Sequence, residues 1–447
     1  MITRSAARKA KSGIPTPTYP TAHFLSLAPE LIYRIGDEAE LEDLLALRLA
    51  CKSCAALLRW IVYRSLTIDI KWDTYSPVLD KLELLAKTKD HPARLATKEL
   101  NLKLISGTYG RRDTKVVSYE RRVKALLVPA LQALKNVSKL RWNNSFAKVQ
   151  QVEKDVLGGI KHIIPNLTSL EISGINIGYS NSYDNLGSLE TPLEILANPR
   201  LPRLTRLAIS AHGQKDPSHG PNMVFLSSLM KATTKILANS RATLQSFEFR
   251  IPFGAVAAHG SFPPTFQTLF KLESVDSIVS PNSSDASVPM DSYTALTHLV
   301  IDTDFISAVR SATLTIPQLP SLQSLDIWQA YDYYPARTPE AALSTKVDIW
   351  TALINTRVRL RSLTKINISP DFLQYLSANS SGAELGKLEI TCHVNMDISN
   401  SNGERETRER QRQQEMGAEL FTRAIIPHRA FLESFAIWTN NSGLGHS

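Results

Sequence analysis

Cys51 and Cys54 have the spacing of a C-x-x-C pair, the feature of this chain most suited to chemistry. Such a pair can bind zinc beside a second pair of ligands, and it can carry redox chemistry at a strand-to-helix turn with one exposed thiolate. The only comparable second pair is Cys392 with His393. Cys51 and Cys54 lie in an apolar stretch with helical spacing, so we expect both of them to be packing residues.

Other candidate sites are weaker. His212 and His219 could share a metal ion with Asp216, but the polar sequence around them favours an ordinary surface loop. Residues 382–388 have the glycines and lysine of a phosphate-binding loop, yet the stretch is one residue too short and has Leu388 where Ser or Thr is required. No H-E-x-x-H, G-x-S-x-G or G-x-G-x-x-G occurs. The sequence therefore predicts no catalytic residue, metal site or cofactor.

The composition is that of an ordinary globular protein. The 447 residues are 43% hydrophobic and 21% charged, three are cysteine, and the formal net charge is +9.

Residues 1–22 are basic, and we expect a disordered leader there, with a mitochondrial presequence as the alternative. The basic tract 111–124 has a single aromatic residue, Tyr119, which favours a solvated face over nucleic-acid binding. With no apolar run long enough to cross a bilayer, we expect a cytoplasmic and/or nuclear protein without membrane or nucleic-acid partners.

Residues 27–66 have the pattern of three short helices. Pro29 and Glu30 suit the first turn of a helix. Leu44 and its neighbours spread apolar side chains over most of the circumference of a second helix, and further apolar residues follow from Leu57. A unit of about forty residues is too small to bury so many apolar side chains alone. We therefore expect it to need a partner surface, on another protein or on the rest of this chain.

This segment resembles the F-box, a helical module that docks proteins onto the Skp-type adaptor of cullin-RING ubiquitin ligases. Leu27-Ala28-Pro29-Glu30-Leu31 is similar to the leading element of that family, and Leu47-Arg48-Leu49-Ala50-Cys51-Lys52 to a later one. Cys54 departs from the family, since many members have a large apolar residue there. The resemblance implies that the adaptor contacts come from Leu27, Pro29, Leu31, Ile35, Leu44 and Leu47.

A short pattern recurs along the rest of the chain: apolar, two residues, apolar, one residue, apolar. Its clearest copies begin at Leu167, Leu204, Leu296, Leu322 and Leu385, and looser copies begin at Tyr63, Val137, Leu244, Leu363 and Leu432. The alternation that ends each copy predicts a short strand with one buried face. Between copies, apolar residues at helical spacing predict helices over residues 149–163 and 223–239.

Strand, loop and helix in repetition resemble the leucine-rich repeat, over residues 66–440. The copies are unevenly spaced and mostly lack the asparagine ladder of that family, and a doubly wound parallel sheet is the competing fold. Ten or more strands and the lack of a phosphate-binding turn favour the solenoid. We therefore predict an α/β chain with a three-helix F-box-like module (residues 23–66), an irregular leucine-rich-repeat α/β solenoid (67–440) and a tail (441–447).

The leucine-rich-repeat resemblance also implies a binding surface. In such solenoids the residues between the apolar positions of each strand point to the concave side, where partners usually bind. The mixed charge of this row favours a protein or peptide as the partner. Exposed Trp and Arg are typical of binding hot spots. Trp328 and Trp438 could instead cap the core. The residues that we expect to bind a target are Arg141, Arg206, Asp326, Trp328, Lys365 and Trp438.

These expectations together predict the substrate-recognition subunit of a Skp–cullin–F-box ubiquitin ligase. The N-terminal module would bind the adaptor, and through it a cullin-RING ligase, while the repeats would bind an unidentified protein substrate. Ubiquitin transfer would then depend on proximity, with no reactive residue in this chain. The alternative is a leucine-rich-repeat interaction scaffold whose N-terminal helices only cap the solenoid.

Overall fold

The chain divides into two compact units, Met1–Arg64 and Ser65–Ser447, so the boundary falls at Arg64 rather than at the predicted Leu66. The predicted leader and tail lie outside the residues that the structure describes. This computed structural model describes residues 27–71, 77–105, 114–143, 150–176, 193–212, 223–251, 269–270, 293–302, 319–328, 349–355, 357–368, 370–378, 385–393, 411, 414–415 and 417–440.

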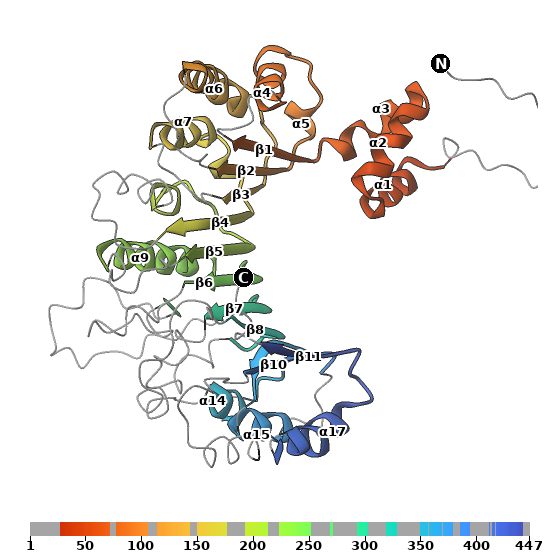
Figure 1. Ribbon diagram of the computed structural model, residues 1–447, viewed down its shortest axis with the longest axis vertical. Coiled ribbons are helices and arrows are strands. Elements are labelled where there is room, and N and C mark those ends of the chain that lie inside the picture. Colours follow the sequence, from red (N-terminus) through yellow and green to blue (C-terminus); the bar gives the residue numbers. More distant parts are fainter. Residues whose placement is uncertain are drawn as a thin grey trace, which may run out of the picture. The chain divides into compact units, whose positions relative to one another are not determined.

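Three helices make up the described part of the N-terminal unit: α1 (Pro29–Glu38), α2 (Leu41–Ala50) and α3 (Lys52–Val62) (Figure 1). Proline begins α1, where its missing N–H costs no helical hydrogen bond. Each helix contributes one residue to the core, namely Ile32, Leu44 and Leu58. Gly36 allows α1 to approach α3 closely, because a Cβ at this position would overlap the side chain of Ile61.

The described part of the second unit contains a parallel sheet of eleven strands, and the predicted α/β class is confirmed. The strands follow one another in chain order, whereas a doubly wound sheet reverses its strand order. The strands are β1 (Ser65–Lys71), β2 (Glu99–Ile105), β3 (Lys139–Asn143), β4 (Ser169–Asn176), β5 (Arg206–His212), β6 (Ser246–Arg250), β7 (His298–Asp302), β8 (Ser324–Trp328), β9 (Ser362–Asn367), β10 (Lys387–His393) and β11 (Ser434–Asn440).

The register of the sheet aligns the apolar positions of the recurring pattern. The middle apolar residue of each copy pairs with its counterpart on the next strand, as in Leu170 with Leu207 and Leu207 with Phe247. All ten predicted copies fall at strands. In β9, however, Leu363 and Ile366 occupy the last two apolar positions, because the register shifts between β9 and β10. The predicted assignment of Leu363 to the first position was therefore wrong.

One strand, β2, was not predicted. Its Leu100 and Leu102 pair with Leu140 and Trp142 of β3 and are fully buried. The first apolar position of this copy is occupied by Thr97, which is also fully buried. The Thr97 hydroxyl donates a hydrogen bond of 2.7 Å to the carbonyl of Ala93, which satisfies the polar group inside the core.

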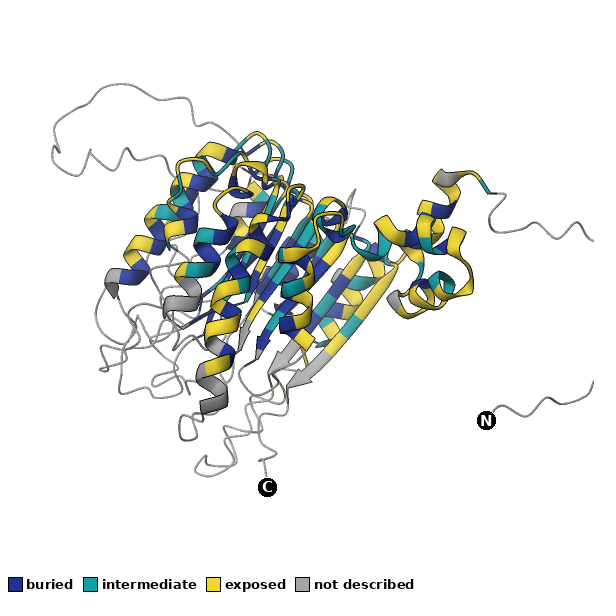
Figure 2. Ribbon diagram, turned by 90° about the horizontal axis from the view of Figure 1, so that it is seen from above, coloured by how far each residue is buried: buried dark blue, intermediate teal, exposed yellow. Residues whose placement is uncertain are grey.

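Helices lie between many of the strands and cover one face of the sheet, where the apolar residues of the strands are buried (Figures 1 and 2). Helix α4 packs against α6, α6 against α7, and α14 against α15. The predicted helices at 149–163 and 223–239 are confirmed as α7 and α9. The described helical segments of this unit are α4 (Pro77–Lys87), α5 (Ala93–Ala96), α6 (Thr114–Gln132), α7 (Gln150–Ile160), η2 (Ile164–Asn166), α9 (Met223–Ser240), α14 (Ile349–Asn355), α15 (Pro370–Ala378), η7 (Leu420–Ile425) and α17 (Ile426–His428).

Equivalent residues at the start of successive strands are joined by backbone hydrogen bonds. The N–H of Thr168 donates to the carbonyl of Ser138, the N–H of Thr205 to Thr168, and the N–H of Gln245 to Thr205, all at 2.8 Å. The hydroxyls of Thr168 and Thr205 donate to the same carbonyls as their own N–H groups. The turn that precedes each strand is thus repeated along the sheet. Among the described helices, none is both long and apolar enough to cross a membrane.

Candidate interaction surfaces

The six residues predicted to bind an adaptor divide between the core and the surface of the N-terminal unit. Leu31 and Ile35, one turn apart on α1, are 48% and 43% exposed. Leu44 is only 5% exposed and belongs to the core, so in this conformation it supports the fold and is not available to a partner. Leu27 and Leu47 are half-buried against that core. Pro29 begins α1, and its side chain lies outside the described residues.

Further apolar side chains of this unit are exposed and were not among the predicted contacts. Leu45 and Leu49 lie one turn apart on α2 and are 42% and 88% exposed, while Tyr33 of α1 and Trp60 of α3 are about 40% exposed. The dense apolar content of α2 was the signal that could have identified Leu45 and Leu49, because a helix that buries one face leaves the residues of its other face in solvent. The unit therefore presents apolar surface on all three helices.

Cys51 and Cys54 occupy different environments. Cys51 is exposed and caps the N-terminus of α3, where its Sγ accepts a hydrogen bond from the backbone N–H of Cys54 at 3.3 Å. Cys54 is buried in the first turn of the same helix. The prediction that both cysteines are packing residues inside a helix is therefore wrong for Cys51, because the chain is extended at that residue.

The face of the sheet opposite the helices carries the predicted target-binding row. Arg141 of β3 forms ion pairs with Glu99 of β2 and Glu171 of β4, at 3.3 and 3.4 Å between Nε and carboxylate oxygens. Arg206 of β5 lies 4.0 Å from both Glu171 and Glu248 of β6. Arg250 ends the series at 2.9 Å from Glu248. We call these residues the charge ladder: Glu99, Arg141, Glu171, Arg206, Glu248 and Arg250.

The charge ladder stabilises the sheet only slightly. The side chains of Arg141 and Arg206 are about half exposed, and exposed ion pairs contribute about 0.2–1 kcal/mol each. Their stronger effect is on geometry, because Arg141 and Arg206 are each held between carboxylates of the strands on either side. The ladder thus presents alternating charges in fixed positions, which can distinguish one partner surface from another.

The other predicted target-binding residues lie on later strands. Asp326 of β8 is in register with Val300 of β7, and Val300 with Glu248, so Asp326 extends the row beyond the charge ladder. Trp328, Lys365 and Trp438 belong to β8, β9 and β11. The side chains of these three residues lie outside the described part of the chain. The structure therefore brings together only Arg141 and Arg206, through their shared contact with Glu171.

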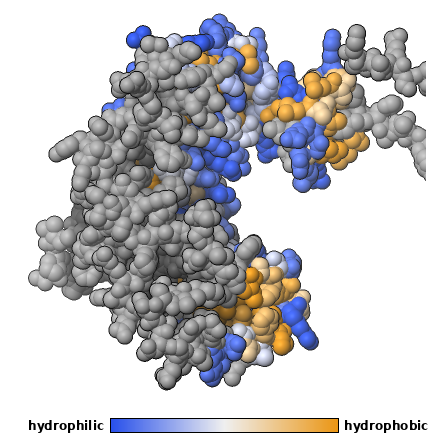
Figure 3. Space-filling model, in the orientation of Figure 1, coloured by the Kyte–Doolittle hydropathy of each residue, from blue (hydrophilic) through white to orange (hydrophobic). Residues whose placement is uncertain are grey.

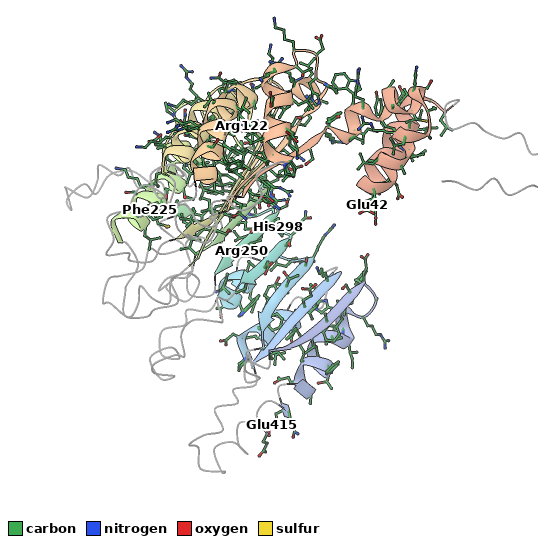
Figure 4. All side chains as sticks on the ribbon, turned by 45° about the horizontal axis from the view of Figure 1, so that its top comes forward. Glu42, Arg122, Phe225, Arg250, His298 and Glu415 are labelled. Carbon is green, nitrogen blue, oxygen red and sulfur yellow. The ribbon has the colours of Figure 1, made fainter. Side chains whose placement is uncertain are left out.

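His298 lies beside the charge ladder on β7, next to the strand that carries Arg250 (Figure 4). Burial lowers the pKa of His298 below its ordinary value, although the carboxylates of Asp326 and Glu248 act in the opposite direction. The folded protein therefore binds a proton at this site less readily than the unfolded chain does. This difference links the stability of the sheet to pH.

We expect the free energy of unfolding to fall as the pH is lowered below about 6.5, the ordinary pKa of histidine, because only the unfolded chain then takes up the proton at His298. The His298→Gln variant should show a shallower fall over the same range. Urea unfolding of both proteins between pH 5 and pH 8, with the same buffer ions, measures the difference. If the free energy of unfolding fell equally with pH in the two proteins, His298 would not be the source of the pH dependence.

Apolar side chains are exposed where the sheet ends at β11. In β1 to β10, the residues at the middle and last apolar positions of the recurring pattern are at most 8% exposed. The corresponding residues of β11, Phe435 and Ile437, are 37% and 42% exposed. Phe421, Ile426 and Phe431 are also about half exposed, and Figure 3 shows apolar surface gathered over this end of the sheet. Among the described residues no strand follows β11, whereas each earlier copy is covered by the next strand.

No family model matches the chain, and no curated protein matches it. Within the described segments, no group of three or more His, Cys, Asp and Glu side chains is placed to hold a metal ion. The arrangement of the described surfaces is suited to binding other proteins through apolar contacts on the N-terminal unit and through fixed charges on the sheet.

Proposed function

We propose that this chain is the substrate receptor of a Skp–cullin–F-box ubiquitin ligase, with the N-terminal module bound to a Skp-type adaptor. The main support for the proposal is that the N-terminal unit has a small core and many exposed apolar side chains. Its central core consists of Ile32, Leu44 and Leu58, while Leu31, Ile35 and other apolar residues around it are 39–88% exposed.

The exposed apolar area of this unit favours a permanent or frequent partner. Covering a leucine or isoleucine side chain stabilises a complex by about 1.5–3 kcal/mol when it is fully buried. Leu31 and Ile35 lie on one face of α1, and Leu45 and Leu49 on one face of α2. The same segment carries the residues that resemble the F-box. A Skp-type adaptor is therefore the partner that we expect to cover these helices.

We infer further that residues 67–440 form an irregular leucine-rich-repeat solenoid. The support is the strict chain order of eleven parallel strands, the alignment of equivalent apolar positions and the repeated hydrogen bonds between successive turns. In this arrangement the charge ladder and Asp326 lie on the face opposite the described helices, and a protein target would bind there.

The expected target is a protein or peptide rather than a nucleic acid. The charge ladder alternates arginine with glutamate, so it does not attract a polyanion as a row of cations would. The basic tract at the start of α6 does not supply a stacking platform either, because its aromatic residue, Tyr119, is 3% exposed. Shape and alternating charge would then select the target.

The mechanism that follows is proximity. The receptor would hold the target near the ubiquitin-conjugating enzyme, which raises the effective concentration of the target lysine at the thioester. The chain would contribute orientation and no reactive group. Its fixed ion pairs suit this role, since they hold the binding face in one arrangement before the target arrives.

Removal of the N-terminal module tests the proposal. We would co-express a Skp-type adaptor with the full chain and with a variant that lacks residues 23–62, which keeps all of β1. The proposal predicts that the adaptor co-purifies with the full chain and is lost with the variant, which remains folded. Capture of the adaptor by both proteins, or by neither while both are folded, would contradict it.

The alternative function, a scaffold whose N-terminal helices only cap the solenoid, predicts a different result in this experiment. A cap shields the core at the end of a repeat array, so its deletion should unfold the neighbouring repeats. Hydrogen exchange across β1 to β3 in the variant separates the two functions. Lost protection there, without adaptor capture by the full chain, would favour the scaffold.

A further inference from the structure

The start of α3 places two thiols of unequal exposure next to each other. The Sγ of Cys51 lies 3.3 Å from the backbone nitrogen of Cys54, and the Cys54 side chain branches from the adjacent Cα. A C-x-x-C pair at a helix N-terminus can close a disulfide in this arrangement, because an extended first cysteine can direct its sulfur back over the first turn. The pair is thus placed for a bond within one module.

The two thiols also differ in reactivity. The backbone N–H of Cys54, and then its thiol, donate to Cys51 and lower the pKa of the exposed Cys51 thiol. Hydrogen bonding to Cys51, and then burial, raise the pKa of the Cys54 thiol. An exposed thiol of lowered pKa beside a buried thiol of raised pKa is the arrangement of an attacking and a resolving cysteine in redox-sensitive proteins.

We propose that Cys51 and Cys54 form a redox-active dithiol site that a peroxide oxidises to an intramolecular disulfide. The proposal does not depend on the ligase function. It assigns Cys51, the exposed residue, as the attacking cysteine and Cys54, which is 6% exposed, as the resolving cysteine.

The chemistry proceeds in two steps. The Cys51 thiolate attacks one oxygen of hydrogen peroxide, the O–O bond breaks, hydroxide leaves, and Cys51 becomes a sulfenic acid. The Cys54 thiol then attacks the Cys51 sulfur, the S–O bond breaks, and a water molecule leaves as the S–S bond forms. The two thiols lose two electrons in total, the peroxide gains them, and a dithiol reductant reverses the change.

The site can be tested directly in the full chain. All variants would carry Cys392→Ser, so that Cys51 and Cys54 are the only cysteines among the three of the sequence that remain. Trypsin separates the two residues, because it cleaves after Lys52 and leaves Cys51 in the peptide 49–52 and Cys54 in the peptide 53–59. After treatment with hydrogen peroxide, a non-reducing digest should contain these two peptides joined by a disulfide. Dithiothreitol should separate them.

Two single variants assign the roles. In Cys54→Ser, Cys51 should remain as a sulfenic acid that dimedone traps. In Cys51→Ser, the Cys54 thiol should react with peroxide at least about tenfold more slowly than Cys51 does in Cys54→Ser. The reason is that Cys54 is buried and its pKa is raised. Absence of the joined peptides from the folded protein would overturn the proposal, and so would equal peroxide reactivity in the two variants or a disulfide that links two chains.

Discussion

Replacement of Leu58 by alanine is expected to unfold the N-terminal module and to leave the sheet folded. Leu58 is fully buried and is one of three core residues that join the helices of this unit. Truncation of a buried leucine costs about 2–5 kcal/mol, and a module of this size rarely has more than about 3–5 kcal/mol of stability. Hydrogen exchange of the full-length Leu58→Ala variant should show lost protection across α1 to α3 and unchanged protection in the sheet.

Leu49→Ala is the matched control for this prediction. Leu49 lies in the same module but is 88% exposed, so its truncation removes little buried area and should leave exchange in α1 to α3 unchanged. Protection that survives in Leu58→Ala would mean that the module is held by contacts other than its small core. Equal losses in the two variants would contradict the division into core and surface residues.

The second large effect is expected from Phe247→Ala in β6. Phe247 is fully buried, and its ring lies 5.8 Å from that of Phe249 and 5.9 Å from that of Phe270 between centroids. Loss of a buried phenylalanine costs about 3–5 kcal/mol, since the cavity cannot close completely. Chemical denaturation followed by circular dichroism should show a lower free energy of unfolding by this amount.

Phe435→Ala provides a control at the same place in the repeat. Phe435 occupies the position in β11 that Phe247 occupies in β6, but it is 37% exposed. Its truncation should cost less than half as much, when measured at a low protein concentration where association does not contribute. A larger loss for Phe435→Ala than for Phe247→Ala would contradict the partial exposure of Phe435.

The strands could be predicted from sequence because each copy of the pattern combines alternation with large aliphatic or aromatic residues. The exception is instructive. In β2 the first position is Thr97, whose hydroxyl donates a hydrogen bond to the carbonyl of Ala93. A search for three apolar residues misses this copy, because a threonine can be buried there once its hydroxyl is hydrogen-bonded to the local backbone. The shift in β9 was missed for a related reason, since a one-residue irregularity changes which residues face the core.

The division between core and surface was harder to predict within the N-terminal module. Leu44 and Leu45 are adjacent and chemically identical, yet one is 5% and the other 42% exposed. Only the angle at which α2 meets its neighbours decides between them, and three short helices can pack in several ways. The position of Cys51 was misjudged because the end of α2 and the start of α3 are separated by this single extended residue. Helix patterns are continuous across such a junction.

The affinity for a purified Skp-type adaptor tests directly whether the N-terminal module binds one. We would titrate the adaptor into the full chain and into a variant with Leu31→Asp and Ile35→Asp, two positions that are about half exposed, after hydrogen exchange has shown that α1 is folded in the variant. Leu95→Asp is the control, since Leu95 is an equally exposed leucine in the second unit. Loss of two central apolar contacts should weaken binding at least about 100-fold.

We expect tight binding by the full chain and by Leu95→Asp, and strongly weakened binding by the α1 variant, with all three proteins folded. Equal affinity of the α1 variant and the full chain would contradict the assigned surface. Failure of the folded full chain to bind any Skp-type adaptor would contradict the receptor function itself.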